Sequence, residues 1–272
     1  MRQVSSWLAD NLLTLNTHKT NYICFSICNR TQPSNDFNIK IHTCAIADTC
    51  NCPSLQKVTH TKYLGVLVDQ RLCWHPQLEQ VTNRIRKLSW IFKSLRHVVP
   101  KFDSEKSDSS RNILNEIYVA LVQSVLTYCI PIWGGASKVK FLELERAQRA
   151  LLKIMYFKVN RYSTNSLYQL CDLLSVRKIY ILQTVLKKHK SLPYDPSSIK
   201  SKRRKDIVAV VPITRTVFAC VQYNKRSALL YNKVNKELCI YSKTTHNCKK
   251  VLTDWLKKIT YDETEALLKS IK

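Results

Sequence analysis

The longest hydrophobic pattern in the chain runs from Leu78 to Val99, where apolar residues are spaced alternately three and four apart. This spacing places them on one face of a helix over about residues 76–99. Similar spacing predicts further helices at residues 112–129, 138–157 and 176–190. Pro131 is predicted to end the second helix because proline interrupts helical hydrogen bonding. Residues 73–160 therefore predict a helical region, followed by a further helical segment at 161–192.

The rest of the chain carries shorter and more mixed patterns. Residues 3–13 predict a helix, and β-branched or alternating stretches predict strands at Asn21–Ile27, Phe37–Ile41 and Thr61–Val68. Residues 193–206 predict a basic linker, and 207–272 give weak strand and helix signals that end in two helices, at 251–259 and 263–271. The predicted fold class is α+β, with a small helix-and-strand part at 1–72, a mainly α-helical bundle and a mixed C-terminal region.

The charge of the chain is strongly positive, at +25 over 272 residues. The excess is greatest in residues 161–272, which carry twenty-three basic and eight acidic side chains. A surplus of this size attracts polyanions through counterion release. The predicted partners are therefore RNA, DNA or an RNA–DNA hybrid, and a merely solubilising role for the lysines is the competing interpretation.

The eleven cysteines are scattered and odd in number, which is typical of reduced thiols in an intracellular protein. The most apolar stretch, Val119–Trp133, is too short and too polar to cross a membrane, so no membrane partner is expected. Zinc binding stays open, because ligand types lie near one another without the paired C-x2-C spacing of established sites. These residues are Cys24, Cys28, His42, Cys44, Cys50, Cys52 and His60. Burial of the cysteines as small apolar residues is the alternative.

Two short strings resemble a known family. Residues 7–20 (WLADNLLTLNTHKT) and 62–66 (KYLGV) are similar to the stretch just after the catalytic site in reverse transcriptases of non-LTR retrotransposons, the jockey-like and LINE-type elements. Weaker matches follow at Leu72–Trp74, Ile130–Gly135 and Leu144–Arg149. The resemblance implies the end of a polymerase palm, a thumb and a C-terminal region of an RNA-directed DNA polymerase, which is a nucleotidyltransferase.

The resemblance also implies roles for individual residues. Lys19 matches a lysine that faces the leaving pyrophosphate, where a cation stabilises developing charge. Tyr63, Leu64 and Gly65 match the primer grip, a hairpin that supports the growing 3′ end. Basic residues on the predicted helices are spaced to follow phosphates of a bound template and primer. They are Arg84, Lys87, Lys93, Arg146, Arg149 and Lys153.

The aspartate pair that holds metal ions in such polymerases is absent from the sequence. The resemblance places that pair upstream of Met1, so the chain alone is expected to be inactive and to bind no cofactor. Mg²⁺ is expected for the complete polymerase, and the missing upstream region is a candidate partner.

Three alternatives stay open. The chain is compatible with a non-catalytic nucleic-acid-binding relic, with an interaction protein that uses the helix at 76–99, and with a decayed reading frame. The run Lys200–Lys205 fits a nuclear-import signal, a phosphate-binding tether or a soluble linker equally well.

Overall fold

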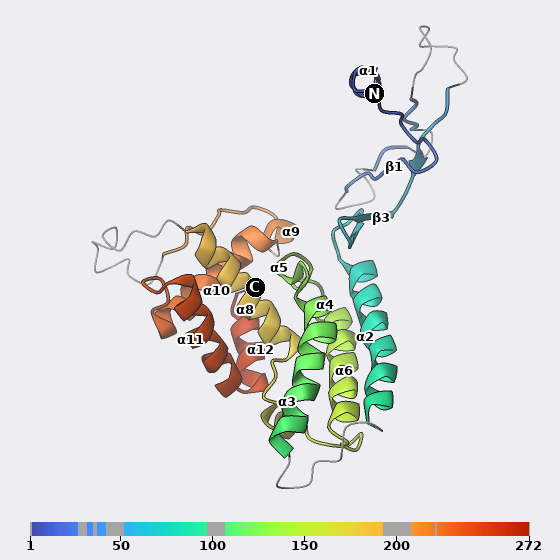
Figure 1. Ribbon diagram of the computed structural model, residues 1–272. Coiled ribbons are helices and arrows are strands. Elements are labelled where there is room, and N and C mark those ends of the chain that lie inside the picture. The colour runs from blue at the N-terminus through green and yellow to red at the C-terminus, as the bar shows by residue number, and fades with distance from the viewer. Residues whose placement is uncertain are drawn as a thin grey trace. The chain divides into compact units, whose positions relative to one another are not determined.

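A computed structural model describes residues 2–26, 32–34, 37–41, 52–96, 107–192, 208–220 and 222–271 (Figure 1). The chain forms two compact units, Met1–Gln77 and Leu78–Lys272. Within the described residues, the first unit contains one complete helix, two small sheets and the start of a second helix, and the second unit contains helices and no strand. The observed class is therefore α+β with helix predominating. The basic run Lys200–Lys205 and four of the possible zinc ligands, Cys28, His42, Cys44 and Cys50, lie outside the described residues.

The first unit is built from short elements. Helix α1 spans Arg2–Asp10, as predicted although it ends earlier. Strands β1 (Asn21–Tyr22) and β2 (Gln56–Lys57) pair in parallel. Strands β3 (His60–Tyr63) and β4 (Val66–Asp69) pair antiparallel, with His60 opposite Asp69 and Tyr63 opposite Val66.

The three predicted strands are corrected by this arrangement. Of Asn21–Ile27, only the first two residues are a strand, and Ile27 lies outside the described residues. Residues 37–41 make only one isolated bridge, Lys40 to Ser54, because the neighbouring Pro53 has no N–H to extend a ladder. Thr61–Val68 is wrong as a single strand, since the chain reverses at Leu64-Gly65 to give a hairpin.

The helices of the second unit follow in a regular series. They are α2 (His75–Leu95, which begins in the first unit), α3 (Ser107–Tyr118), the π-helix η2 (Val119–Gln123), α4 (Ser124–Thr127), α5 (Ile130–Trp133), α6 (Lys138–Met155), α7 (Thr164–Cys171), α8 (Val176–Ser191), α9 (Val217–Cys220), α10 (Tyr223–Leu238), α11 (Thr245–Lys258) and α12 (Tyr261–Lys269). All the helices predicted between 76 and 190 are confirmed, as are the two at the C-terminus. The mixed character predicted for 207–272 is not, because residues 208–220 and 222–271 contain helices and no strand.

Pro131 begins a helix and does not end one. Helices α3, η2 and α4 form one run that ends at Thr127, and Cys129 then adopts a left-handed backbone with φ of 53°. Pro131 lies in the first turn of α5, where its missing N–H would have no helical partner. A Cβ on Gly134 would come within 2.3 Å of the Tyr180 ring, so this position requires glycine to pack against α8.

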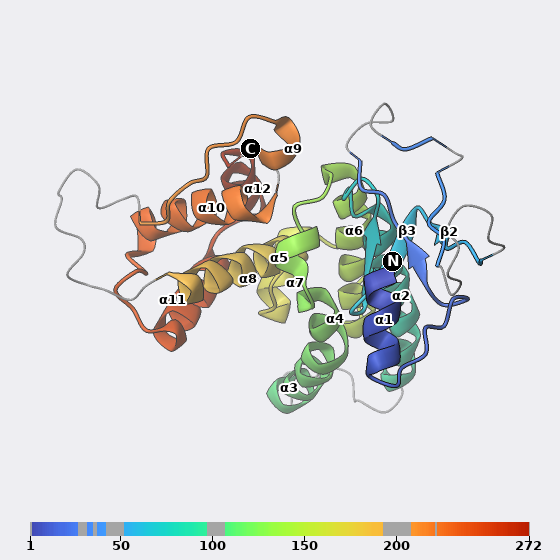
Figure 2. The same ribbon diagram turned by 90° about the horizontal axis from the view of Figure 1, so that it is seen from above.

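Helix α8 is the centre of the second unit. It contacts α4, α5 and α6 from the earlier part of the chain and α10 and α11 from the later part (Figure 2). Its buried residues surround the whole helix, which is typical of a core helix and not of a surface one. The N-terminal cap is Ser175, whose hydroxyl accepts a hydrogen bond from the Lys178 N–H.

A buried amide on α6 joins four segments of the second unit. Gln148 is fully buried and uses every hydrogen-bonding group of its side chain. Its Nε2 donates to the Tyr118 hydroxyl at 2.8 Å and to the Leu174 carbonyl at 3.0 Å. Its Oε1 accepts from the Tyr168 hydroxyl at 2.9 Å and from the Val176 N–H at 2.8 Å. The network therefore fixes α3, α6, α7 and the start of α8 in one arrangement.

A buried ion pair on the same helix makes a second junction. Arg177 donates from Nε to Glu145 Oε1 at 2.5 Å and from Nη2 to Oε2 at 3.0 Å, and both residues are more than nine-tenths buried. The guanidinium lies near the rings of Phe141 and Tyr261, and the Tyr261 hydroxyl donates to Glu145. Burial alone would lower the pKa of Arg177, but the hydrogen bond and charge of Glu145 hold that pKa above its usual value. The pair thereby joins α6, α8 and α12.

Candidate nucleic-acid interface

The hairpin formed by β3 and β4 carries three of the predicted site residues at its tip. Leu64 and Gly65 have φ of 46° and 84°, the two positive values that a two-residue type I′ turn requires. Glycine adopts this conformation without strain, whereas leucine there is uncommon. The side chains of Tyr63 and Leu64 are 67% and 75% exposed. The turn thus presents an aromatic and an aliphatic side chain to solvent at one point.

Asp69 ties this hairpin to the start of helix α2. Its carboxylate accepts hydrogen bonds from the backbone N–H groups of Arg71, Cys73 and Trp74, at 3.3, 3.0 and 2.7 Å. The buried Gln77 side chain adds a further link by accepting from the Leu67 N–H at 2.8 Å. These bonds fix the path of the chain between strand and helix. Sequence reasoning missed this role of Asp69, although an aspartate six residues before the start of a helix is a recognisable turn signal.

Lys19 lies apart from the hairpin in the sequence, in an exposed turn that leads into β1. The turn is closed by Asn16, whose backbone and side-chain oxygens both accept from the Lys19 N–H. The Thr20 hydroxyl also donates to the Asn16 carbonyl, at 2.8 Å. Asn16 therefore holds the backbone of Lys19 in place, and the side chain of Lys19 remains at the surface.

Helix α2 presents a basic outer face. The predicted residues Arg84, Lys87 and Lys93 are all exposed, whereas Leu78, Val81, Ile85 and Phe92 on the opposite side are buried. Two further exposed residues, Arg86 and Trp90, were missed. The spacing of Arg86, Trp90 and Lys93 at i, i+4 and i+7 puts them on one strip and could have revealed them.

The basic residues predicted on α6 have unequal surroundings. Arg146 is exposed, whereas Arg149 is half-buried and its charge acts on Tyr168. The Lys153 ammonium donates to the Asn160 carbonyl just beyond the end of the helix. The two helices α2 and α6 lie side by side in both views, and the Arg96 guanidinium covers the Phe157 ring at 4.1 Å where they end (Figures 1 and 2). Of the three predicted residues on α6, Arg146 is the one most open to a phosphate.

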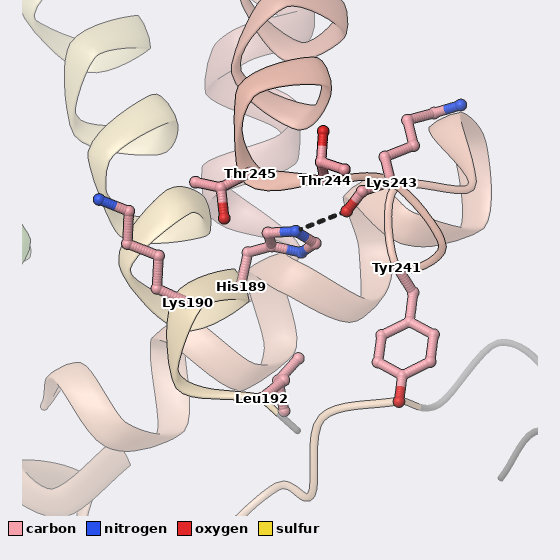
Figure 3. A pocket seen from close by; sticks show the side chains of 7 residues that line it. All are labelled: His189, Lys190, Leu192, Tyr241, Lys243, Thr244 and Thr245. Carbon is pink, nitrogen blue, oxygen red and sulfur yellow. Dashed lines mark hydrogen bonds between the residues drawn. The ribbon is translucent and has the colours of Figure 1, made fainter. Parts of the chain in front are cut away.

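A pocket of about 260 Å³ lies at the junction of α8 and α11, where no site was predicted. It is lined by His189, Lys190, Leu192, Tyr241, Lys243, Thr244 and Thr245 (Figure 3). The His189 ring is hydrogen-bonded at both nitrogens, to the Tyr231 hydroxyl at 2.9 Å and to the Lys243 carbonyl at 3.0 Å. Because a carbonyl only accepts, Nε2 carries the proton of the neutral ring and Tyr231 donates to Nδ1. The two lysine ammonium groups point away from each other in Figure 3, so the pocket does not concentrate positive charge.

The stability of the chain is expected to fall below about pH 6.5 because of His189. Burial lowers the pKa of this imidazole from its ordinary value of 6.5, although the Lys243 carbonyl partly opposes the shift. The folded state then binds fewer protons than the unfolded state, so the contribution is full above the unfolded pKa and is lost as the pH falls through the folded one. Denaturant unfolding of the protein and of His189→Gln between pH 5 and 8 tests this. Parallel pH profiles of the two proteins would contradict the assignment.

The described residues contain no group of three or more histidine, cysteine, aspartate or glutamate side chains that could hold a metal ion. Among the possible zinc ligands only Cys24, Cys52 and His60 fall within that part of the chain. The sequence has no adjacent aspartate pair either. These residues therefore do not fit the metal centre of a polymerase. No helix within the described ranges is both long and apolar enough to cross a bilayer.

Comparison with known proteins gives one informative likeness. The chain is 28% identical over 111 residues to a probable RNA-directed DNA polymerase from transposon BS of Drosophila melanogaster. The match covers 38% of this chain and 11% of that protein, so the chain spans only a small part of its relative. No family model and no solved structure matches. Over the matched stretch, the chain is related to a reverse transcriptase encoded by a transposon.

Proposed function

We propose that the chain is the palm end, thumb and C-terminal region of a reverse transcriptase from a non-LTR retrotransposon of the jockey-like or LINE type. Its function is to bind a template–primer, with RNA, DNA or their hybrid as partner. The similarity to the Drosophila transposon polymerase supports this proposal. So does the order of elements along the chain, in which an exposed lysine turn precedes a hairpin and a long basic helix.

The observation that carries the proposal is the hairpin tip. Tyr63 and Leu64 are held exposed by a turn that contains Gly65, and Asp69 anchors the hairpin to helix α2. A rigid hairpin of this kind is suited to support the end of a primer, because backbone and rings approach nucleic acid closely at a glycine turn. Arg84, Lys87, Lys93, Arg146, Arg149 and Lys153 would contribute contacts to phosphates, and Lys19 would stabilise the leaving group.

The chain by itself would bind and position nucleic acid without transferring nucleotides. Phosphoryl transfer in such polymerases depends on carboxylate-held divalent metal. The sequence has no adjacent aspartate pair, and no group of three metal-ligating side chains lies within the described residues. The complete polymerase would use Mg²⁺, held by an upstream region that acts as partner to this chain. An intracellular and nuclear location would follow from that role.

Two of the alternatives differ from the proposal in measurable ways. A relic would keep basic surface without preference for a primer–template. An interaction protein that pairs through helix 76–99 would need the apolar face of α2, but Leu78, Val81, Ile85 and Phe92 on that face are at most 5% exposed.

Binding to a labelled RNA–DNA primer–template is expected to be strongly salt-dependent and tighter than binding to single-stranded RNA or duplex DNA. Each phosphate that the protein neutralises adds about −0.9 to the slope of log affinity against log salt for duplexes. Replacing Tyr63 and Leu64 together by alanine is expected to weaken hybrid binding by about tenfold. The reason is that the stacking of one base on an aromatic ring contributes about 1–3 kcal/mol. Fluorescence anisotropy across a salt series measures both effects.

The matched control is Ile213→Ala, which removes a 97% exposed aliphatic side chain far along the chain from the hairpin. Equal affinity for all three nucleic acids would favour the relic, with only a generic basic surface. Absence of binding at low salt would overturn the proposal.

A further inference from the structure

The outer face of helix α2 carries an exposed tryptophan between two basic residues. Trp90 is 72% exposed, which is unusual for so large an apolar side chain. Arg86 lies four residues before it and Lys93 three residues after it, so all three share one strip of the helix, about 10 Å long. Both basic residues are exposed. The single acidic residue within α2, Glu79, lies three turns before Trp90.

The chemistry of this strip is selective for unpaired nucleic acid. An indole ring gains about 1–3 kcal/mol by stacking on a base, but a base offers its face only where it is not already stacked within a duplex. Flanking guanidinium and ammonium groups contact the phosphates on either side of that base. Exposed Arg84 and Lys87 on the adjoining strip add to the positive field. The positive charges and the exposed indole ring therefore both favour single-stranded nucleic acid as the ligand.

We infer that this face of α2 binds single-stranded nucleic acid, with Trp90 stacked on an unpaired base and Arg86 and Lys93 on neighbouring phosphates. The inference rests on the proposed function for the class of partner, but it concerns an unpaired strand and not the paired primer end. It adds two residues, Arg86 and Trp90, to the surface that binds nucleic acid. The opposite face of α2 is buried, so the helix presents the strip rigidly.

The test compares the full-length protein with its Trp90→Ala and Trp90→Phe variants on a short single-stranded RNA and on the same sequence as a blunt duplex. Trp90→Ala is expected to weaken single-strand binding by about tenfold and duplex binding by less than about twofold. Because tryptophan carries no charge, the salt slope stays unchanged, whereas Lys93→Ala lowers it by about 0.7. Trp90→Phe keeps most of the affinity but loses the RNA-dependent quenching of tryptophan fluorescence.

Trp7→Ala is the matched control, since Trp7 is also exposed, at 59%, and lies on α1. Unchanged thermal unfolding of Trp90→Ala would show that the fold is intact. The inference is overturned if Trp90→Ala binds single strands like the parent, if it weakens the duplex equally, or if Trp7→Ala has the same effect. The inference is also overturned if the unmodified protein does not bind the single strand, whereas loss of binding to the RNA–DNA primer–template described above would overturn the proposed function.

Discussion

Replacing Gln148 by leucine is expected to lower the free energy of unfolding by about 4 kcal/mol. Leucine fills a similar volume but offers no hydrogen bond, so four groups lose their partner inside the core: the hydroxyls of Tyr118 and Tyr168, the Leu174 carbonyl and the Val176 N–H. Each buried polar group left unpaired costs about 1–3 kcal/mol. Part of this cost is recovered because hydroxyls rotate and the core relaxes.

Urea denaturation measured by circular dichroism gives the change directly. The control is Glu143→Gln on the same helix, where a surface pair with Lys140 at 3.4 Å is lost and a change under about 0.5 kcal/mol is expected. A Gln148→Leu protein as stable as the parent would show that these four hydrogen bonds do not form in solution. Because Gln148 lies in the Leu144–Arg149 string that resembles the retrotransposon family, the expected loss of stability would also give that string a structural role.

Replacing Glu145 by alanine is expected to cost about 3–5 kcal/mol, because it leaves the Arg177 guanidinium buried without a counter-charge. The double variant Glu145→Leu, Arg177→Met is expected to recover much of that loss, since apolar residues of similar size often replace a buried ion pair without net cost. The single variants Glu145→Leu and Arg177→Met form, with this double variant, a cycle that isolates the coupling between the side chains.

If Glu145→Ala lowered the free energy of unfolding by less than about 1 kcal/mol, the prediction would be contradicted. Such a result would indicate that the ion pair is in contact with water. The surface pair between Lys257 and Asp172, at 2.6 Å, supplies the comparison. Asp172→Asn is expected to change stability by less than about 1 kcal/mol because both side chains are substantially exposed.

The long helices could be predicted from sequence because each buries one regular face. In α2 the buried residues Leu78, Val81, Ile85 and Phe92 follow the spacing that the prediction used. Helix α7 was not resolved as a separate element, since only Leu167 and Cys171 are buried within its eight residues. Pro131 was misassigned because proline is common both just after one helix and in the first turn of the next. Only the left-handed Cys129 backbone distinguishes the two cases, and spacing does not reveal it.

The candidate site was predictable only in part. The hairpin tip was indicated by the family resemblance, whereas alternation over Thr61–Val68 suggested one strand. The three basic residues on α2 followed from the pattern, but Trp90 was assigned no role. The partners of Gln148 lie 20 to 30 residues away in the chain, so no local pattern could have assigned them.

The central position of α8 has a consequence for how such a chain can be shortened by evolution or by cloning. Its sides are covered partly by helices that precede it and partly by α10 and α11, which follow residues 193–207. A reading frame that stopped after Ser191 would leave the apolar surface of α8 exposed where α10 and α11 normally cover it. The product would be prone to aggregation and to degradation by proteases. The helices that precede α8 and those that follow residues 193–207 are therefore expected to be needed together for a stable fold.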